Sequence, residues 1–189
     1  MSDESTLIDR RTIVKYGLGI GLCCAPLVAQ APIARLPQGP RAGDLLVKSG
    51  DAAQAPLTPA EVPLAAMPLS VWAMDPTSGE VRSSSRLHQI ILMRLPEDAM
   101  AARTRERAAA GVLAYTAICT HTGCEVTEWV EAERALHCPC HASLFDPFDA
   151  GVVLDGPAPR SLPALPLRVA DGQLVVAGPF SSLVGHEPV

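Results

Sequence analysis

Two short stretches rich in cysteine and histidine constrain this chain more than any other feature. The first reads CTHTGC at residues 119–124, and the second reads CPCH at residues 138–141. Each offers one cysteine and one histidine at metal-binding spacing, together with one further cysteine. Two thiolates and two imidazoles can hold one iron–sulfur cluster, with the thiolates on one iron and the imidazoles on the other. The ligands in that arrangement are Cys119, His121, Cys138 and His141.

The residues around these stretches make the pattern more specific. Ala142 and Ser143 follow the second stretch, and GPAP at residues 156–159 comes shortly after them. With these additions the chain resembles the Rieske iron–sulfur proteins over roughly residues 85–178. The resemblance implies an all-β fold, which is a Rieske-type antiparallel β-sandwich with a small cluster-binding subdomain at residues 119–160. It also implies one [2Fe–2S] cluster as the cofactor.

The resemblance also assigns roles to residues outside the ligand set. Cys124 and Cys140 would form a disulfide that braces the two ligand loops. The match to the proline loop that covers the cluster in this family consists of Gly156, Pro157, Ala158 and Pro159. The alternative is a structural zinc site, which also uses cysteine and histidine at short spacings. Zinc would leave Cys124 and Cys140 unexplained and would give the proline loop no role.

Three residues near the ligands bear on the reduction potential and on the kind of partner. Ser143 matches a serine that donates a hydrogen bond to a bridging sulfide in relatives of high potential. Phe145 stands where those relatives have a tyrosine whose hydroxyl bonds a ligand sulfur, which argues against the highest potentials. Thr122 replaces a leucine of the quinol-oxidising relatives. Both departures resemble the small Rieske subunits of arsenite-oxidase-type molybdenum enzymes.

Composition favours the same fold class and excludes one class of partner. Hydrophobic residues make up 48% of the chain, which is enough for a core, although only 4% of residues are aromatic. The 18 prolines and 14 glycines are typical of a loop-rich β protein rather than a helical bundle. A formal charge of −5 argues against nucleic acid as a partner, because such proteins present a basic surface.

Residues 1–34 are interpreted as a targeting segment. Arg10 and Arg11 lie in a stretch that resembles a twin-arginine export signal, and an apolar run follows from Tyr16 to about Ala34. The run is about as long as the ~20 residues that span a bilayer, so it would be either a cleaved signal or a retained anchor helix. The expected location is the bacterial periplasm, with the protein soluble or anchored to the inner membrane. An oxidising compartment of that kind also lets a disulfide persist.

The rest of the chain divides into three regions. Residues 35–68 are rich in proline, alanine and glycine, so we expect a linker or peripheral segment with a possible short strand at residues 45–47. Residues 69–178 would form the Rieske domain, with a short helical insertion at residues 96–110. Residues 179–189 would form a polar tail. Strands are expected at residues 69–74, 88–93, 112–118, 126–130, 134–137, 152–154, 166–169 and 173–176.

Three classes of function fit these observations. The favoured class is the electron-transfer subunit of an exported respiratory oxidoreductase, which relays single electrons between a catalytic subunit and a cytochrome. The second is the Rieske subunit of a cytochrome bc complex, which takes electrons from quinol. The third is the ferredoxin component of an oxygenase, and the export signal and the extra cysteine pair count against it. The expected partners are a larger redox subunit, of molybdopterin or cytochrome b type, and a c-type cytochrome or similar acceptor. The chain shows no substrate site of its own, so catalytic residues are not assigned.

Overall fold

The computed structural model describes residues 39–186 of the 189-residue chain. These residues all lie within one compact unit, Arg35–Val189. The twin-arginine stretch and the apolar run therefore fall outside the described residues, as do the last three residues of the predicted tail. None of the helices found within residues 39–186 has the length and apolarity that crossing a membrane requires.

Most of the chain forms one antiparallel sheet in the order β10-β11-β1-β2-β3-β4-β9. Its strands are β1 (Leu45–Lys48), β2 (Leu69–Met74), β3 (Ile90–Arg94), β4 (Val112–Thr116), β9 (Ala164–Leu165), β10 (Leu167–Ala170) and β11 (Gln173–Val176). The two edge strands β9 and β10 are consecutive in the chain and are separated by Pro166. The sheet therefore curls until its edges come together in a near-barrel.

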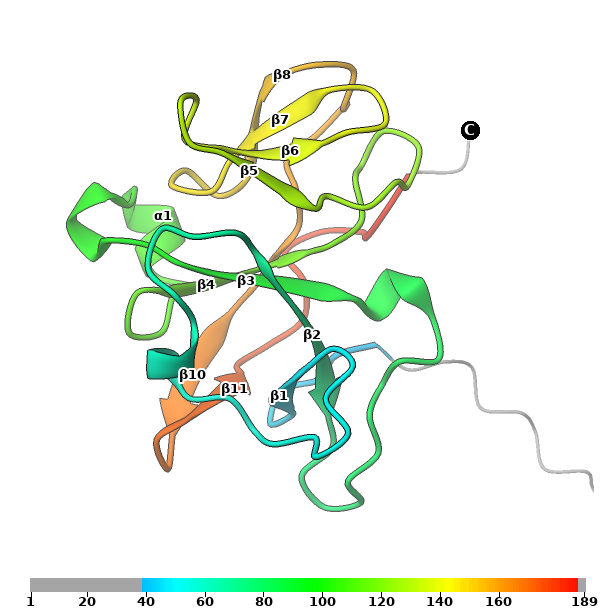
Figure 1. Cartoon of the computed structure of the whole chain (residues 1–189), viewed down its shortest axis with the longest axis vertical. Coiled ribbons are helices and arrows are strands. Elements are labelled where there is room, and N and C mark those ends of the chain that lie inside the picture. Colours follow the sequence, from blue (N-terminus) through cyan, green and yellow to red (C-terminus); the bar gives the residue numbers. More distant parts are fainter. Residues whose placement is uncertain (1–38, 187–189) are drawn as a thin grey trace, which may run out of the picture. The chain divides into compact units, whose positions relative to one another are not determined.

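A second antiparallel sheet, in the order β5-β6-β7-β8, carries much of the motif region. Its strands are β5 (Glu128–Val130), β6 (Ala135–Cys138), β7 (Ser143–Asp146) and β8 (Val152–Asp155). In Figure 1 these strands lie at the top, above β3 and β4. One hydrophobic cluster joins the two sheets, with Met93 and Tyr115 from the large sheet against Leu136 and Phe145 from the small one. The predicted all-β fold with a separate small sheet is confirmed.

Local elements follow the sequence pattern closely but not completely. β2 has the predicted bounds, and the turn between β10 and β11 consists of Asp171 and Gly172, whose φ angles of +51° and +77° suit a two-residue hairpin. The helical insertion is broken into a 3₁₀ turn, η4 (Glu97–Ala99), and one turn of α-helix, α1 (Ala102–Arg105). The strand expected from His88 begins only at Ile90, because His88 ends a 3₁₀ turn, η3 (Arg86–His88).

The linker interpretation of residues 35–68 is wrong for much of that segment. β1 lies in the middle of the large sheet between β2 and β11, and a 3₁₀ turn, η2 (Pro59–Glu61), follows it. Leu46, Leu57 and Val62 are buried in the core of that sheet. The segment belongs to the domain because its few apolar residues find partners far along the chain. In the tail, Phe180 packs against this same core, whereas Leu183 is exposed.

A buried ion network ties the start of β1 to the loop after β2. Arg82 donates two hydrogen bonds to Asp44, at 2.7 and 3.0 Å, and a third to Asp75 at 3.2 Å. Arg82 and Asp44 are only 8% and 3% exposed. Its hydrogen bonds to Asp44 raise the pKa of Arg82, so the guanidinium is charged at any ordinary pH. An exposed pair of the same type joins Arg103 to Asp149 at 2.5 Å.

The contrast between these two pairs gives a stability prediction. Asp44→Asn leaves the buried Arg82 charge without its main partner and should reduce the free energy of unfolding by about 3–5 kcal/mol, the usual effect of breaking a buried pair. Asp149→Asn is the matched control, and its effect should fall within the scatter of the measurement because water screens that pair. Urea unfolding followed by tryptophan fluorescence measures both variants. Equal losses in the two variants would show that burial is not what makes the first pair important.

Candidate metal centre

The first ligand loop is a closed turn at the end of β4. The Cys119 amide donates to the Cys124 carbonyl at 2.7 Å, and the Gly123 amide donates back to the Cys119 carbonyl at 3.1 Å. Gly123 adopts a φ of +78°, which glycine tolerates without a steric penalty. The turn therefore fixes Cys119 and His121 relative to each other.

The second ligand loop is the turn between β6 and β7. Cys138 is the last residue of β6 and pairs with Ser143, the first residue of β7. The chain reverses direction between them, and Ala142 takes a left-handed φ of +57°. The backbone amides of Cys140 and His141 act to lower the pKa of Cys138, but burial outweighs them and the pKa is raised.

The structure brings Cys119 and Cys138 together as free, buried thiols. Each is 1% exposed, neither forms a disulfide, and both belong to the same buried cluster. Burial, and then the neighbouring Cys119, raise the pKa of Cys138 to about 11. Two thiolates cannot lie side by side in a buried position unless a cation compensates their charge, and iron is a cation that thiolates bind. The donor pair therefore fits one iron of a cluster.

His121 and His141 form the second pair. Their ring centroids lie 4.7 Å apart with the rings at 86°, in an edge-to-face arrangement. His141 is exposed, whereas His121 is half-buried and its Nδ1 atom is buried without a hydrogen-bond partner. An imidazole nitrogen in that situation is suited to binding a metal. The four predicted ligands thus fall into two pairs, one buried and one reaching the surface.

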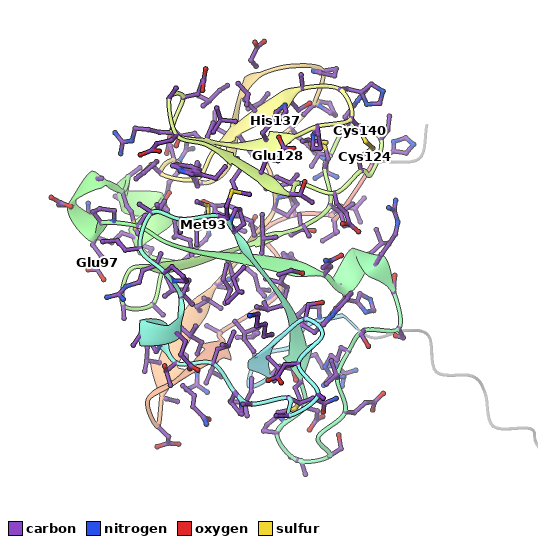
Figure 2. All side chains as sticks on the ribbon, in the orientation of Figure 1. Met93, Glu97, Cys124, Glu128, His137 and Cys140 are labelled. Atoms are coloured by element: carbon purple, nitrogen blue, oxygen red, sulfur yellow. A yellow bond between two sulfur atoms is a disulfide. The ribbon has the colours of Figure 1, made fainter. Side chains whose placement is uncertain are left out.

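No three side chains of histidine, cysteine, aspartate or glutamate in residues 39–186 gather as they would around a single metal ion. The other histidines are held elsewhere. His137 pairs with Glu128 at 2.7 Å on β5 and β6, as Figure 2 shows, and His88 lies in η3.

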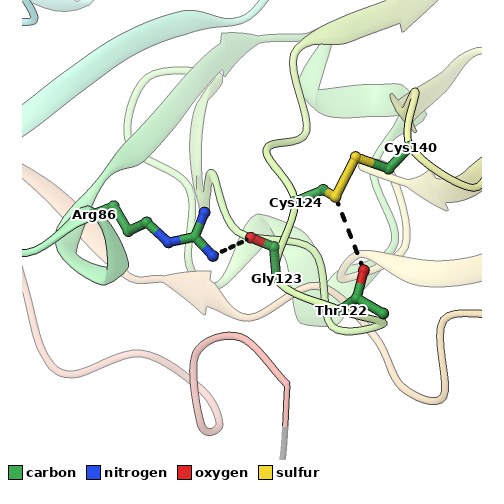
Figure 3. Close-up of a disulfide and its surroundings, with 5 residues drawn as sticks. All are labelled: Arg86, Thr122, Gly123, Cys124 and Cys140. Carbon is green, nitrogen blue, oxygen red and sulfur yellow. Dashed lines mark hydrogen bonds between the residues drawn. A yellow bond between two sulfur atoms is a disulfide. The ribbon is translucent and has the colours of Figure 1, made fainter.

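A disulfide joins the two ligand loops, as predicted. Cys124 and Cys140 are bonded, with their Cα atoms 6.4 Å apart (Figure 3). The Thr122 hydroxyl lies 3.9 Å from the Cys124 sulfur and is the donor, since a disulfide sulfur carries no hydrogen. This covalent link stops the loops from separating even if one of the ligands is released.

The predicted proline loop packs directly against Ser143. The Ala158 amide donates to the Ser143 hydroxyl at 3.2 Å, and both residues are buried. The hydroxyl hydrogen of Ser143 thereby stays available to donate in another direction. A Cβ atom on Gly156 would lie 2.6 Å from the Cα of Ser143, so only glycine allows this approach. Phe145, two residues further along β7, is fully buried in the core cluster that includes both free cysteines.

Two contacts of the first ligand loop were not predicted from the sequence. An Arg86 nitrogen donates to the Gly123 carbonyl at 2.7 Å, and the Thr120 hydroxyl donates to the Arg160 carbonyl at 2.7 Å. The guanidinium of Arg160 in turn bonds the carbonyls of Leu183 and Gly185, which fastens the C-terminal segment beside the site. These partners are far apart in the sequence, and although Arg160 directly follows the proline loop, neither contact has a sequence signature of its own.

Comparison with known proteins identifies the family. The family model for the Rieske [2Fe–2S] domain matches residues 71–166. The chain belongs to the Rieske family. Proteins of this family bind one [2Fe–2S] cluster.

The names of individual Rieske relatives refer to different complexes, a nitrate reductase in one case and cytochrome bc1 in another. A protein of Haloferax mediterranei named for the Rieske subunit of a respiratory nitrate reductase is 42% identical over 97 residues, which are 50% of this chain and 43% of that protein. The Rieske iron–sulfur subunit of the Streptomyces lividans cytochrome bc1 complex is 31% identical over 133 residues, which are 69% of this chain and 78% of the relative. A soluble Rieske domain from Sulfolobus acidocaldarius has a TM-score of 0.38 at 25% identity, over 50% of this chain and 65% of its own.

The packing of the proline loop gives a second prediction. Gly156→Ala should reduce the free energy of unfolding by about 2–4 kcal/mol, from backbone strain at positive φ and from the clash with Ser143. Gly172→Ala is the control, because that glycine also has a positive φ but an added Cβ there would meet no other atom within 4 Å. It should lose only about 1 kcal/mol. Urea unfolding gives the two losses, and the visible absorbance of the cluster should fade faster in the Gly156 variant. Equal fading in both variants would contradict the packing role.

Proposed function

We propose that this protein is the electron-transfer subunit of an exported respiratory oxidoreductase, relaying single electrons between a catalytic subunit and a cytochrome. The observation that carries the proposal is the arrangement of the four ligand candidates, with a buried cysteine pair and a histidine pair that reaches the surface. Such a site has one accessible side for electron exchange. The cluster that it holds accepts and gives up one electron at potentials between about −150 and +300 mV.

In this proposal Cys119 and Cys138 bind one iron, and His121 and His141 bind the other. The chain's own residues keep that site rigid and dry. The disulfide limits how far the two loops can separate. The Ser143 hydroxyl accepts from the Ala158 amide of the proline loop, so its own hydrogen would be free to bond the cluster. The exposed imidazole of His141 is where a partner would approach.

Two residues favour this class over a quinol-oxidising complex. Phe145 offers no hydroxyl to a ligand sulfur, and exposed Thr122 replaces the apolar residue expected at a quinone-docking tip. The relative named for a nitrate reductase agrees with a partner other than a cytochrome b. Most of the relatives found carry the name of a cytochrome bc1 subunit, so a bc-type complex is the second candidate.

We infer that the protein works in the periplasm, either soluble or anchored to the inner membrane. The support is the twin-arginine stretch at Arg10 and Arg11 and the apolar run that follows. The twin-arginine route carries folded proteins, and a cluster assembled in the cytoplasm requires such a route. The disulfide is consistent with an oxidising destination.

The ligand assignment is tested by replacing each candidate in turn. Cys119→Ser, His121→Ala, Cys138→Ser and His141→Ala should each abolish the paramagnetic signal of the reduced cluster, because each iron then lacks a ligand. His137→Ala is the control, since His137 bonds Glu128 and should leave the signal intact. Electron paramagnetic resonance and iron analysis, with about two irons per chain expected in the wild type, provide the measurement. A full signal in any of the four variants would remove that residue from the set.

The partner is identified by purifying the native protein with whatever remains bound to it. Mass spectrometry should find a molybdopterin-type subunit, whereas a cytochrome b would overturn the proposal in favour of a bc complex. The matched control carries Arg10→Lys and Arg11→Lys, which should keep folded, cluster-loaded protein in the cytoplasm. Unchanged export of that control would show that the segment is not a twin-arginine signal.

Phe145 tests the argument about the reduction potential. Phe145→Tyr would place a hydroxyl beside the free cysteines, and a hydrogen bond to a ligand sulfur stabilises the electron-richer reduced state. A preference of about 1 kcal/mol, typical of one hydrogen bond, corresponds to a rise of about 40 mV in the midpoint. Ser143→Ala should lower the midpoint by a similar or larger amount. Voltammetry of both variants at one pH is the measurement. A midpoint that stays fixed in Phe145→Tyr while Ser143→Ala responds would remove the argument from Phe145.

A further inference from the structure

Arg86 lies outside the two ligand loops but forms a hydrogen bond to the first ligand loop, residues 119–124. It begins η3, directly before β3, and its side chain is exposed. A guanidinium nitrogen donates to the Gly123 carbonyl at 2.7 Å across a separation of 37 residues (Figure 3). Gly123 belongs to the turn that carries Cys119 and His121, so the contact anchors the ligand-bearing turn to the large sheet.

Arg86 contacts the turn closely at Gly123, and Gly123 is in turn hydrogen-bonded to Cys119. A Cβ atom on Gly123 would lie 3.1 Å from the Arg86 nitrogen, so the guanidinium rests against the turn itself. The Gly123 amide donates to the Cys119 carbonyl at 3.1 Å. Two hydrogen bonds that meet at Gly123 therefore link the Arg86 guanidinium to the Cys119 carbonyl.

In the part of the chain that the structure describes, Arg86 forms no ion pair with a carboxylate. Arg82 and Arg103 each form an ion pair with aspartate. Within residues 39–186, no aspartate or glutamate oxygen lies within ion-pair distance of the Arg86 guanidinium. Its hydrogen bond to a neutral carbonyl leaves the full positive charge at the ligand loop.

We propose that Arg86 is a positioning residue that holds the first ligand loop and, through its charge, raises the reduction potential of the [2Fe–2S] cluster. The proposal rests on the ligand set given under the proposed function. Reduction adds one negative charge to the site, and a nearby cation stabilises the reduced form more than the oxidised form. Because Coulomb interactions fall with distance and with solvent exposure, a part of this effect survives at an exposed residue beside the loop.

The charge is separated from the hydrogen bond by comparing Arg86→Gln, Arg86→Lys and Arg168→Gln. Glutamine can still donate a hydrogen bond but has no charge, whereas lysine keeps the charge. Arg168 is exposed on β10, at the lower end of the domain in Figure 1, and its replacement removes the same charge far from the small sheet. Midpoint potentials are measured by voltammetry on the purified, cluster-loaded protein at one pH and one salt concentration.

We expect Arg86→Gln to lower the equilibrium constant for reduction of the cluster three- to tenfold. This corresponds to a fall of about 28–59 mV in the midpoint potential, at 59 mV per tenfold change. Arg86→Lys should lose less than half of that, and Arg168→Gln should stay within the error of the wild type. A midpoint in Arg86→Gln equal to that of Arg168→Gln would overturn the proposal, as would an equal fall in Arg86→Lys. If Arg86→Gln takes up no iron, recovery of the cluster in Arg86→Lys supports the proposal, and failure to recover it overturns the proposal.

The outcomes distinguish a failure of the proposed function from a failure of the role proposed for Arg86. A wild-type protein without the paramagnetic signal of a Rieske cluster would remove the proposed function itself. A wild-type protein with that signal, together with an unresponsive Arg86→Gln variant, would remove only the role of Arg86. Hydrogen exchange of the 119–124 amides adds a readout of the anchor alone, and exchange should be faster in Arg86→Gln than in Arg168→Gln.

Discussion

The close approach of Cys119 and Cys138 is the contact on which the rest of the site depends. Cys119 follows β4 of the large sheet, and Cys138 ends β6 of the small sheet, so the two thiols meet only when the sheets pack together. The same apolar cluster that joins the sheets contains both sulfurs. Packing of the core and assembly of the metal centre are therefore one event, and a change that separates the sheets would also separate the ligands.

Three kinds of interaction stabilise the site: a covalent bond, close packing and an electrostatic contact. The disulfide between Cys124 and Cys140 fixes the two loops to each other, and the close approach of Gly156 fixes the proline loop to Ser143. Arg86 fixes the first loop to the large sheet. An electron relay benefits from this redundancy, because ligands that move little between oxidation states leave a low barrier to electron transfer. Neighbouring groups of this kind also tune the metal that they surround.

Much of the site could be predicted from the sequence, because ligand chemistry sets residue types and spacing within short loops. The two stretches, which include the disulfide pair, and the proline loop are each short and have a characteristic sequence. A short strand at residues 45–47 was expected, but neither the place of β1 in the sheet nor the contact of Arg86 could be predicted in the same way. β1 is a four-residue strand in a proline-rich segment, and its place in the sheet is fixed by Leu46 packing against strands that come later in the chain. Arg86 has no local motif, and its contact with Gly123 exists only in the folded protein.

The asymmetry between the two donor pairs decides how the proposed relay can work. The cysteine side is sealed by the core, where Phe145 and the Ser143–Ala158 contact exclude water. In this buried, low-dielectric region a hydrogen bond to a ligand sulfur is stronger than it would be in water. Each such bond therefore has a larger effect on the reduction potential. The histidine side meets solvent at His141, where a partner can come close to the metal without opening the fold. In the proposed relay, buried groups and the exposed charge of Arg86 would tune the potential, and electrons would be exchanged through the histidine side.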